Sequence, residues 1–270
     1  MNLEKIKKIL TVIFVVSVLT SVYLIYDYLK DLDTVKKQNN ELQQMINGNE
    51  QLSDTIDQPN VFDIKILEKY KSVYDKNNDF IGWLKIEGTT VDYPVMQTKN
   101  DEGYYLRKDF EKNQNLNGSL FVSALSEVGV GKTGNNYENG IKPSTNIMIY
   151  GHSMKSGEMF GNLEHFNNKV YASQHPIIKF DTLYEEREYE IISVFYSQIY
   201  YEHDQVFKFY QFYDAETEDK FDYWYQNIKN LSIYDTNVEA TYGDEFITLV
   251  TCAYHTENGR FVVVGKRLMN

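Results

Sequence analysis

Apolar residues follow two different patterns along the chain. Residues 9–26 form an uninterrupted apolar run, ILTVIFVVSVLTSVYLIY, without a charged side chain. Beyond residue 80, short runs rich in Val, Ile, Tyr and Phe recur, each bounded by Gly, Asn or Asp. The first pattern predicts a helix long enough to span a membrane, and the second is typical of strands in a closed or sandwiched β structure.

Eight such runs predict eight strands. They are WLKIEG (83–88), TVDYPVMQ (90–97), SLFVSA (119–124), NIMIYG (146–151), IIKFDT (177–182), YEIISVFYSQIY (189–200), FITLVTCAY (246–254) and RFVVVGKRL (260–268). Helices are expected over 61–77, 157–168 and 214–230. The last carries an apolar stripe with helical spacing, made of Phe221, Trp224, Tyr225 and Ile228, which predicts core packing.

The N-terminal run predicts the location of the protein. Lys5, Lys7 and Lys8 precede it, so the positive-inside preference keeps residues 1–8 cytoplasmic and exports the chain that follows the anchor at 9–28. A cleaved signal peptide is the competing interpretation, but its apolar region is usually about 7–15 residues long and is followed by a small-x-small site. We therefore expect a single-pass membrane protein whose remaining part is extracellular.

Residues 29–60 predict a helical stem and linker. Leu29, Leu32, Val35, Leu42 and Met45 have helical spacing, but the pattern lapses between Lys36 and Asn40. The segment ends in GNEQLSDTIDQPN (48–60), which is typical of a linker. The stem is expected to space residues 61–270, a single domain, away from the bilayer, and its dimerisation stays open.

Composition narrows the function. The chain has 27 basic and 39 acidic residues, a net charge of -12, and no basic patch, which argues against a nucleic-acid partner. The single cysteine, Cys252, excludes an internal disulfide framework and a cluster of thiolate metal ligands. An unpaired thiol outside the cell is exposed to oxidation, so its presence needs an explanation.

Cys252 and two other residues can converge at the ends of predicted strands. His152 follows NIMIYG, Cys252 ends FITLVTC, and Arg260 would return beside Cys252 through a hairpin. A thiolate can attack a carbonyl, an imidazole can exchange the proton, and a guanidinium can stabilise an oxyanion. Each residue also has a structural alternative: a buried Cys, a structural His and a surface Arg. Among the five histidines, His255 is a rival base and no spacing suggests metal ligands.

Several motifs resemble those of class B sortases. Thr248-Leu-Val-Thr-Cys252 followed by Arg260 looks like their TLxTC…Arg signature, and Tyr150-Gly-His152 like their histidine motif. Further agreement comes from Gly82-Trp-Leu-Lys-Ile-Glu-Gly88, Val91-Asp-Tyr-Pro-Val95, Asn117-Gly-Ser-Leu-Phe121, His152-Ser-Met-Lys155 and Met159-Phe-Gly161. The resemblance covers essentially all of residues 61–270.

This resemblance implies a mainly β fold with helices: an eight-stranded sortase β-barrel, an N-terminal helix, and a helix in the long connection before the Cys252 strand. It also implies a cysteine transpeptidase at the outer face of a Gram-positive membrane. Cys252 would cleave an Asn-Pro-x-Thr-Asn-like sorting motif of a secreted protein after Thr through a thioacyl intermediate. His152 would protonate the leaving amine and deprotonate the incoming peptidoglycan amine, and Arg260 would hold the oxyanion or the substrate backbone.

The family also suggests substrate contacts. Leu106 stands where an apolar contact is expected, Thr251 neighbours the nucleophile, and Val250 and Glu102 depart from the Ser and Asn common at their positions. No cofactor and no metal are expected. Two other functions stay open: an exported cysteine endopeptidase that passes the acyl group to water, and a membrane-anchored binding module in which Cys252 is merely buried.

Overall fold

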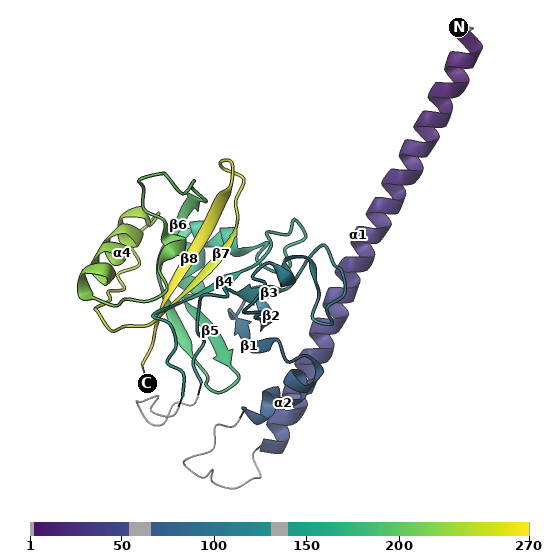
Figure 1. Cartoon of the computed structure of the whole chain (residues 1–270). Helices are drawn as coiled ribbons and strands as arrows, with labels where there is room; N and C mark the ends of the chain where they lie inside the picture. Colours follow the sequence, from purple (N-terminus) through teal and green to yellow (C-terminus); the bar gives the residue numbers. More distant parts are fainter. Residues whose placement is uncertain (1–2, 54–65, 131–139, 270) are drawn as a thin grey trace.

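The N-terminal helix is far longer than the apolar run alone. The computed structural model describes residues 3–53, 66–130 and 140–269, and α1 (Leu3–Ser53) is one continuous helix of 51 residues (Figure 1). An 18-residue window of α1 has a mean hydropathy of 2.4 and is 0% buried. By length and composition this part of α1 can cross a membrane. A cleaved signal sequence would have the same length and composition.

The eight predicted strands are all present and close into one barrel. They are β1 (Phe80–Lys85), β2 (Asp92–Met96), β3 (Leu120–Val122), β4 (Asn146–Tyr150), β5 (Ile177–Thr182), β6 (Glu188–Gln198), β7 (Phe246–Cys252) and β8 (Gly259–Arg267). Their order around the barrel is β1-β2-β3-β4-β7-β8-β6-β5. Most pairs are antiparallel, but β2 pairs with β3 and β4 with β7 in parallel, and the second of these pairings brings the C-terminal ends of β4 and β7 to the same edge.

Two of the three predicted helices form where the pattern places them. The described part of the first is α2 (Glu68–Lys76), and residues 61–65 lie outside the described ranges. The helix expected over 214–230 is α4 (Glu218–Leu231), capped by the Thr217 side chain, which accepts from Lys220 N. Shorter helices are η1 (Tyr104–Arg107), η2 (Leu163–Asn167), α3 (Lys169–Gln174) and η3 (Phe209–Gln211).

The helix expected over 157–168 is wrong in its first half. Residues 157–162 form turns, and the helical structure begins only with η2 at Leu163. Gly157 has a φ of +88°, a left-handed conformation that interrupts a right-handed helix. The motif GEMFG therefore forms a loop after β4 rather than a helix.

Two apolar clusters hold the barrel and α4 together. One fills the barrel and takes side chains from all eight strands, such as Leu84, Ile147 and Val263. The other lies between α4 and the outer face of β4, β6, β7 and β8, where Trp224 and Ile228 meet Val250 and Val262. Because strand side chains alternate between faces, the same strands serve both clusters.

The C-terminal half of α1, which contains the predicted stem, packs on the barrel. Val35, Leu42 and Ile46 are buried there, and the helix continues through Ser53, the first six residues of the predicted linker. The polar stretch where the apolar pattern lapses supplies contacts: Lys36 pairs with Glu158 (2.8 Å), and Gln38 Nε2 donates to Asp109 Oδ2 (3.0 Å). Figure 1 shows the N-terminal half of α1 projecting beyond the barrel.

Candidate active site

The parallel pairing of β4 and β7 brings His152 to Cys252. Their residues align from Asn146 with Phe246 to Tyr150 with Val250. Past the end of β4, Gly151 N still donates to Val250 O (3.1 Å) and Thr251 Oγ1 donates to Gly151 O (2.8 Å). Extending this register by two residues puts His152 level with Cys252, at the end of the neighbouring strand.

The hairpin of β7 and β8 brings Arg260 to the other side of Cys252. The two strands pair antiparallel, and Cys252 lies directly opposite Arg260. Because directly opposed residues share a face of the sheet, both side chains lie on the outer face of the barrel. His152, Cys252 and Arg260 thus form one row across three adjacent strand ends, which we call the catalytic row after the role that the sequence analysis expects of these residues.

The catalytic row is accessible from solvent. Cys252 is a free thiol, and it is half-buried, as are His152 and Arg260. Ala253 and Gly259 are buried beneath the turn, whereas Tyr254 is 83% exposed. A nucleophile must be reached by its substrate, and these strand ends satisfy that requirement. His255, the rival base, is exposed in the turn and packs its ring edge-on against Tyr196, with centroids 4.9 Å apart.

A backbone carbonyl orients the His152 imidazole. Nε2 of His152 lies 2.7 Å from Leu106 O in η1. A carbonyl only accepts, so Nε2 carries the proton and Nδ1 is the nitrogen left to exchange a proton with another group. Burial lowers the pKa of His152 below its ordinary value, the bond to Leu106 opposes this shift, and the charge of Arg107 adds to it.

Two glycines allow this close arrangement. Gly118 has a φ of +61°, and a Cβ there would lie 2.5 Å from Leu106 O, the acceptor of the His152 bond. A Cβ on Gly151 would lie 2.4 Å from Leu120 Cδ2 and 2.6 Å from a ring carbon of Phe160. Larger residues at either position would displace the segment that holds His152 or its acceptor.

Arg260 is held near the row by its own turn. Its Nη1 donates to Asn258 O (3.2 Å) and Gly259 O (2.9 Å). Burial raises the pKa of Tyr150, and the nearby charge of Glu102 raises it further, whereas that of Arg260 lowers it. Both charges therefore act on Tyr150, a half-buried residue two positions before His152.

The four predicted substrate contacts separate into two pairs. Leu106 is 44% exposed and Glu102 is also exposed, so both side chains are accessible. Val250 is 1% exposed and packs under α4, and Thr251 is 2% exposed and bonded to Gly151 O. The side chains of Val250 and Thr251 are thus buried, whereas those of Leu106 and Glu102 are exposed, and the contacts of all four with substrate stay predictions.

Sequence reasoning missed the roles of Leu106 O and Gly118. A backbone acceptor leaves no trace in residue identity, although the motif Asn117-Gly118-Ser119 marked the turn that supports it. Within the described ranges, no group of three or more His, Cys, Asp or Glu side chains is arranged to hold a metal ion. The chemistry available at this site is that of a thiol, an imidazole and a guanidinium.

Comparisons with known proteins identify relatives of the whole domain. The Sortase domain family matches residues 84–268. A sortase B of Listeria monocytogenes serovar 1/2a is 32% identical over 205 residues, which cover 75% of each protein. The sortase B of Bacillus anthracis in complex with AAEK1 superposes with a TM-score of 0.70 at 24% identity, over 90% of this chain and all of that one. A Staphylococcus aureus sortase B–substrate complex gives 0.69 at 24% identity, over 88% and 96% of the two chains.

The family match spans more than half of the chain, and it includes the catalytic row and seven of the strands in full. The chain therefore belongs to the sortase family. Within that family it is a class B sortase, since its curated relative and its structural neighbours are sortase B proteins.

Proposed function

We propose that this sortase is a cysteine transpeptidase that joins secreted proteins to peptidoglycan. The observation that carries the proposal is the catalytic row, in which the only thiol of the chain lies between an imidazole and a guanidinium. An unpaired extracellular cysteine is a liability unless its reactivity is used. A strand end open to solvent is a suitable place for that use.

The reaction would exchange one amide bond for another. The Cys252 thiolate attacks the threonine carbonyl of an Asn-Pro-x-Thr-Asn-like motif, and the remaining guanidinium N–H groups of Arg260 stabilise the oxyanion. The peptide C–N bond breaks as the His152 imidazolium protonates the leaving amine. A peptidoglycan amine then attacks the thioester, returns its proton to His152 and releases the thiolate, so no oxidant or cofactor is consumed.

Amine dependence tests the proposal against hydrolysis. Purified enzyme is mixed with a fluorogenic Asn-Pro-x-Thr-Asn peptide, with and without a peptidoglycan-type amine such as triglycine or meso-diaminopimelic acid. The expected result is a ligated product in which the new amide follows threonine. Release of only the free acid at every amine concentration would assign the chain to the endopeptidases, and no cleavage of any sorting-type peptide would favour a binding module.

We also propose that residues 9–28 anchor the enzyme with residues 1–8 in the cytoplasm and the catalytic domain, 61–270, outside. The exposed apolar half of α1 and the three lysines before it support this topology. Because Cys252 is the only cysteine in the sequence, a membrane-impermeant methanethiosulfonate reagent shows directly on which side of the membrane it lies. Intact cells should show labelled Cys252.

The matched control is Leu3→Cys in a Cys252→Ala background. It should be labelled only after the cells are permeabilised. Recovery of a shortened chain from the culture medium would instead identify the run as a cleaved signal peptide.

A further inference from the structure

The contact between His152 and Leu106 joins two loops, and α1 binds both. The first, residues 104–119, contains the acceptor Leu106. Asp31 of α1 receives two hydrogen bonds from it: Asn115 Nδ2 donates to Asp31 O (3.1 Å), and Leu116 N donates to Asp31 Oδ2 (2.9 Å). Backbone amides bonded to a carboxylate form strong, directional contacts, so Asp31 fixes this part of the loop to the helix.

Hydrogen bonds within the loop connect the Asp31 contact to Leu106. Asn115 N donates to Arg107 O (3.0 Å), and Arg107 Nη1 donates to Leu116 O (3.0 Å). Ser119 N donates to Tyr105 O (3.0 Å). The segment that binds α1 is therefore bonded to the residues on both sides of Leu106.

The second loop, residues 152–161, contains His152 itself. Lys36 of α1 forms an ion pair of 2.8 Å with Glu158, whose side chain is only 11% exposed. Burial alone would raise the pKa of Glu158, but hydrogen bonds from Lys36 and Ser156 outweigh it and hold the pKa below its ordinary value. Phe160 N donates to His152 O (3.0 Å), which connects the paired segment to His152.

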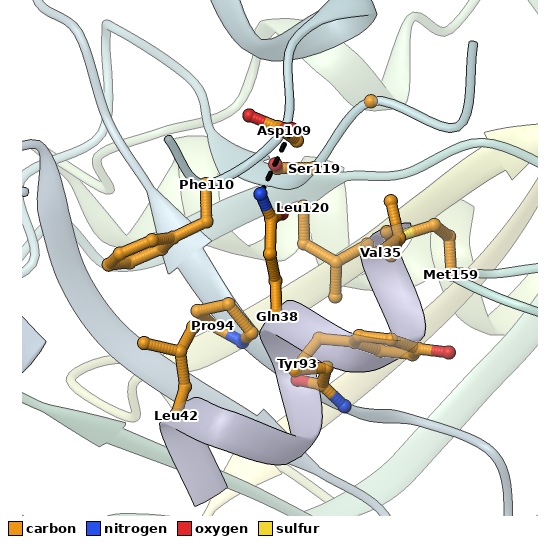
Figure 2. A pocket seen from close by; sticks show the side chains of 12 residues that line it. Val35, Gln38, Leu42, Tyr93, Pro94, Asp109, Phe110, Ser119, Leu120 and Met159 are labelled. Carbon is orange, nitrogen blue, oxygen red and sulfur yellow. Dashed lines mark hydrogen bonds between the residues drawn. The ribbon is translucent and has the colours of Figure 1, made fainter. Parts of the chain in front are cut away.

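The helix fits closely between these loops. Figure 2 shows Val35 beside Met159, and Gln38 reaching Asp109 next to Ser119. The cavity between Val35–Leu42 of α1 and the segments around Asp109 and Met159 is about 20 Å³, room for no more than one water molecule. A displacement of α1 would therefore be transmitted to both loops.

We propose that Asp31 and Lys36 of the membrane-proximal helix are positioning residues that set the orientation of the His152 imidazole by holding its own loop and its acceptor loop together. The inference rests on the proposed role of His152 in transpeptidation. It makes the stem a part of the active-site scaffold. Neither residue touches the catalytic row, so both act through the two loops.

Matched variants of the full-length enzyme in detergent micelles test this role. Asp31→Ala and Lys36→Met should each lower kcat by about tenfold with KM unchanged, because misplacement by 1 Å can cost up to about a hundredfold in rate. Asp33→Ala and Lys37→Met are the controls. Asp33 and Lys37 lie on the same helix and pair with each other at the surface (2.7 Å), and these variants should keep the wild-type kcat.

Two further measurements separate positioning from a general loss of structure. Asp31→Asn keeps an acceptor oxygen for Leu116 N and should recover most of the wild-type kcat. In ¹⁵N-histidine-labelled protein, the hydrogen-bonded Nε2 proton of His152, assigned with His152→Gln, should give a resolved downfield resonance in the wild type. That resonance should be lost in Asp31→Ala and Lys36→Met while both retain cooperative thermal unfolding.

The inference is overturned if all α1 variants share the wild-type kcat and imidazole resonance while the wild type transfers peptides. It is also overturned if the control variants lose as much kcat as Asp31→Ala and Lys36→Met. An inactive wild type would instead contradict the proposed function, so the two failures are distinguishable.

Discussion

Two neighbouring rows on the outer face of the barrel have the same backbone geometry and opposite surroundings. The first row, Tyr150, Val250 and Val262, crosses β4, β7 and β8, and its two valines are buried beneath α4. The second is the catalytic row, two residues further along β4 and β7, and none of its residues belongs to the apolar cluster beneath α4. The valines are 1% and 0% exposed, whereas the three residues of the catalytic row are half-buried.

The difference shows how one sheet provides both packing and chemistry. Strand geometry aligns side chains in rows. Whether a helix packs over a row determines whether its side chains are buried or can meet a substrate. Under α4 a row contributes hydrophobic stabilisation. In the neighbouring row, the same strand spacing places a thiol between an imidazole and a guanidinium.

The largest expected effect comes from removing the nucleophile. Cys252→Ala should lower kcat by at least about a thousandfold, because no other thiol exists in the chain to form the acyl intermediate. Peptide ligation measured by chromatography checks this, with thermal unfolding as the control for folding. Appreciable ligation by Cys252→Ala would show that the catalytic row is no more important for catalysis than the row beneath α4.

His152→Gln should come next, with a loss of about a hundredfold or more. The wild-type profile of kcat/KM against pH should be bell-shaped, with its lower pKa shifted below the ordinary value of a histidine, because burial lowers the pKa of His152. Below that pKa the thiol and the imidazole are both protonated, and activity is lost as pH falls. In His152→Gln the acid limb of the profile should be replaced by a single ionisation of the thiol. An unchanged bell-shaped profile would exclude His152 as one of the two ionising groups.

Arg260→Lys should have an intermediate effect, lowering kcat by about tenfold to a hundredfold with a smaller change in KM. Lysine keeps the charge but not the planar fork of N–H donors that an oxyanion or a peptide backbone needs. Steady-state kinetics on the same peptide give the comparison. A lysine variant with wild-type kcat would show that only the charge of Arg260 matters.

The smallest effect on catalysis is expected in the covered row. Val250→Ala should leave KM and kcat within about twofold of wild type but lower the free energy of unfolding by about 2 kcal/mol, since it opens a cavity in a well-packed cluster. Denaturant titration and ligation kinetics are measured on the same sample. A large change in KM would show that Val250 contributes to substrate binding.

Most of the barrel could be predicted from the sequence because short alternating runs encode strands locally. The catalytic row followed from the positions of Cys252, His152 and Arg260 at strand ends, with the family motifs specifying their order. The docking of α1 could not be predicted. Its polar stretch at Lys36–Asn40 reads as a break in an apolar pattern, and only the fold reveals that these residues bind Glu158, Asp109 and the backbone of β2.

The burial of Val250 and Thr251 was missed for a related reason. Proximity to Cys252 in sequence suggested contact with substrate, but alternation turns Thr251 to the opposite face, and α4 covers Val250. Leu106 was predicted for its apolar side chain, whereas its carbonyl orients His152. Backbone roles of this kind depend on the path of the chain and leave no mark on residue identity.

The most direct test of the central claim is the intact mass of the enzyme during turnover. Wild-type enzyme mixed with a sorting-motif peptide and no amine should gain the mass of the acyl fragment ending in threonine, attached at Cys252. Addition of triglycine or diaminopimelic acid should remove that mass and yield the ligated peptide. An acyl group on any residue other than Cys252 would contradict the account. So would ligation with no acyl adduct, both in rapidly quenched wild-type enzyme and in the His152→Gln variant, which turns over slowly.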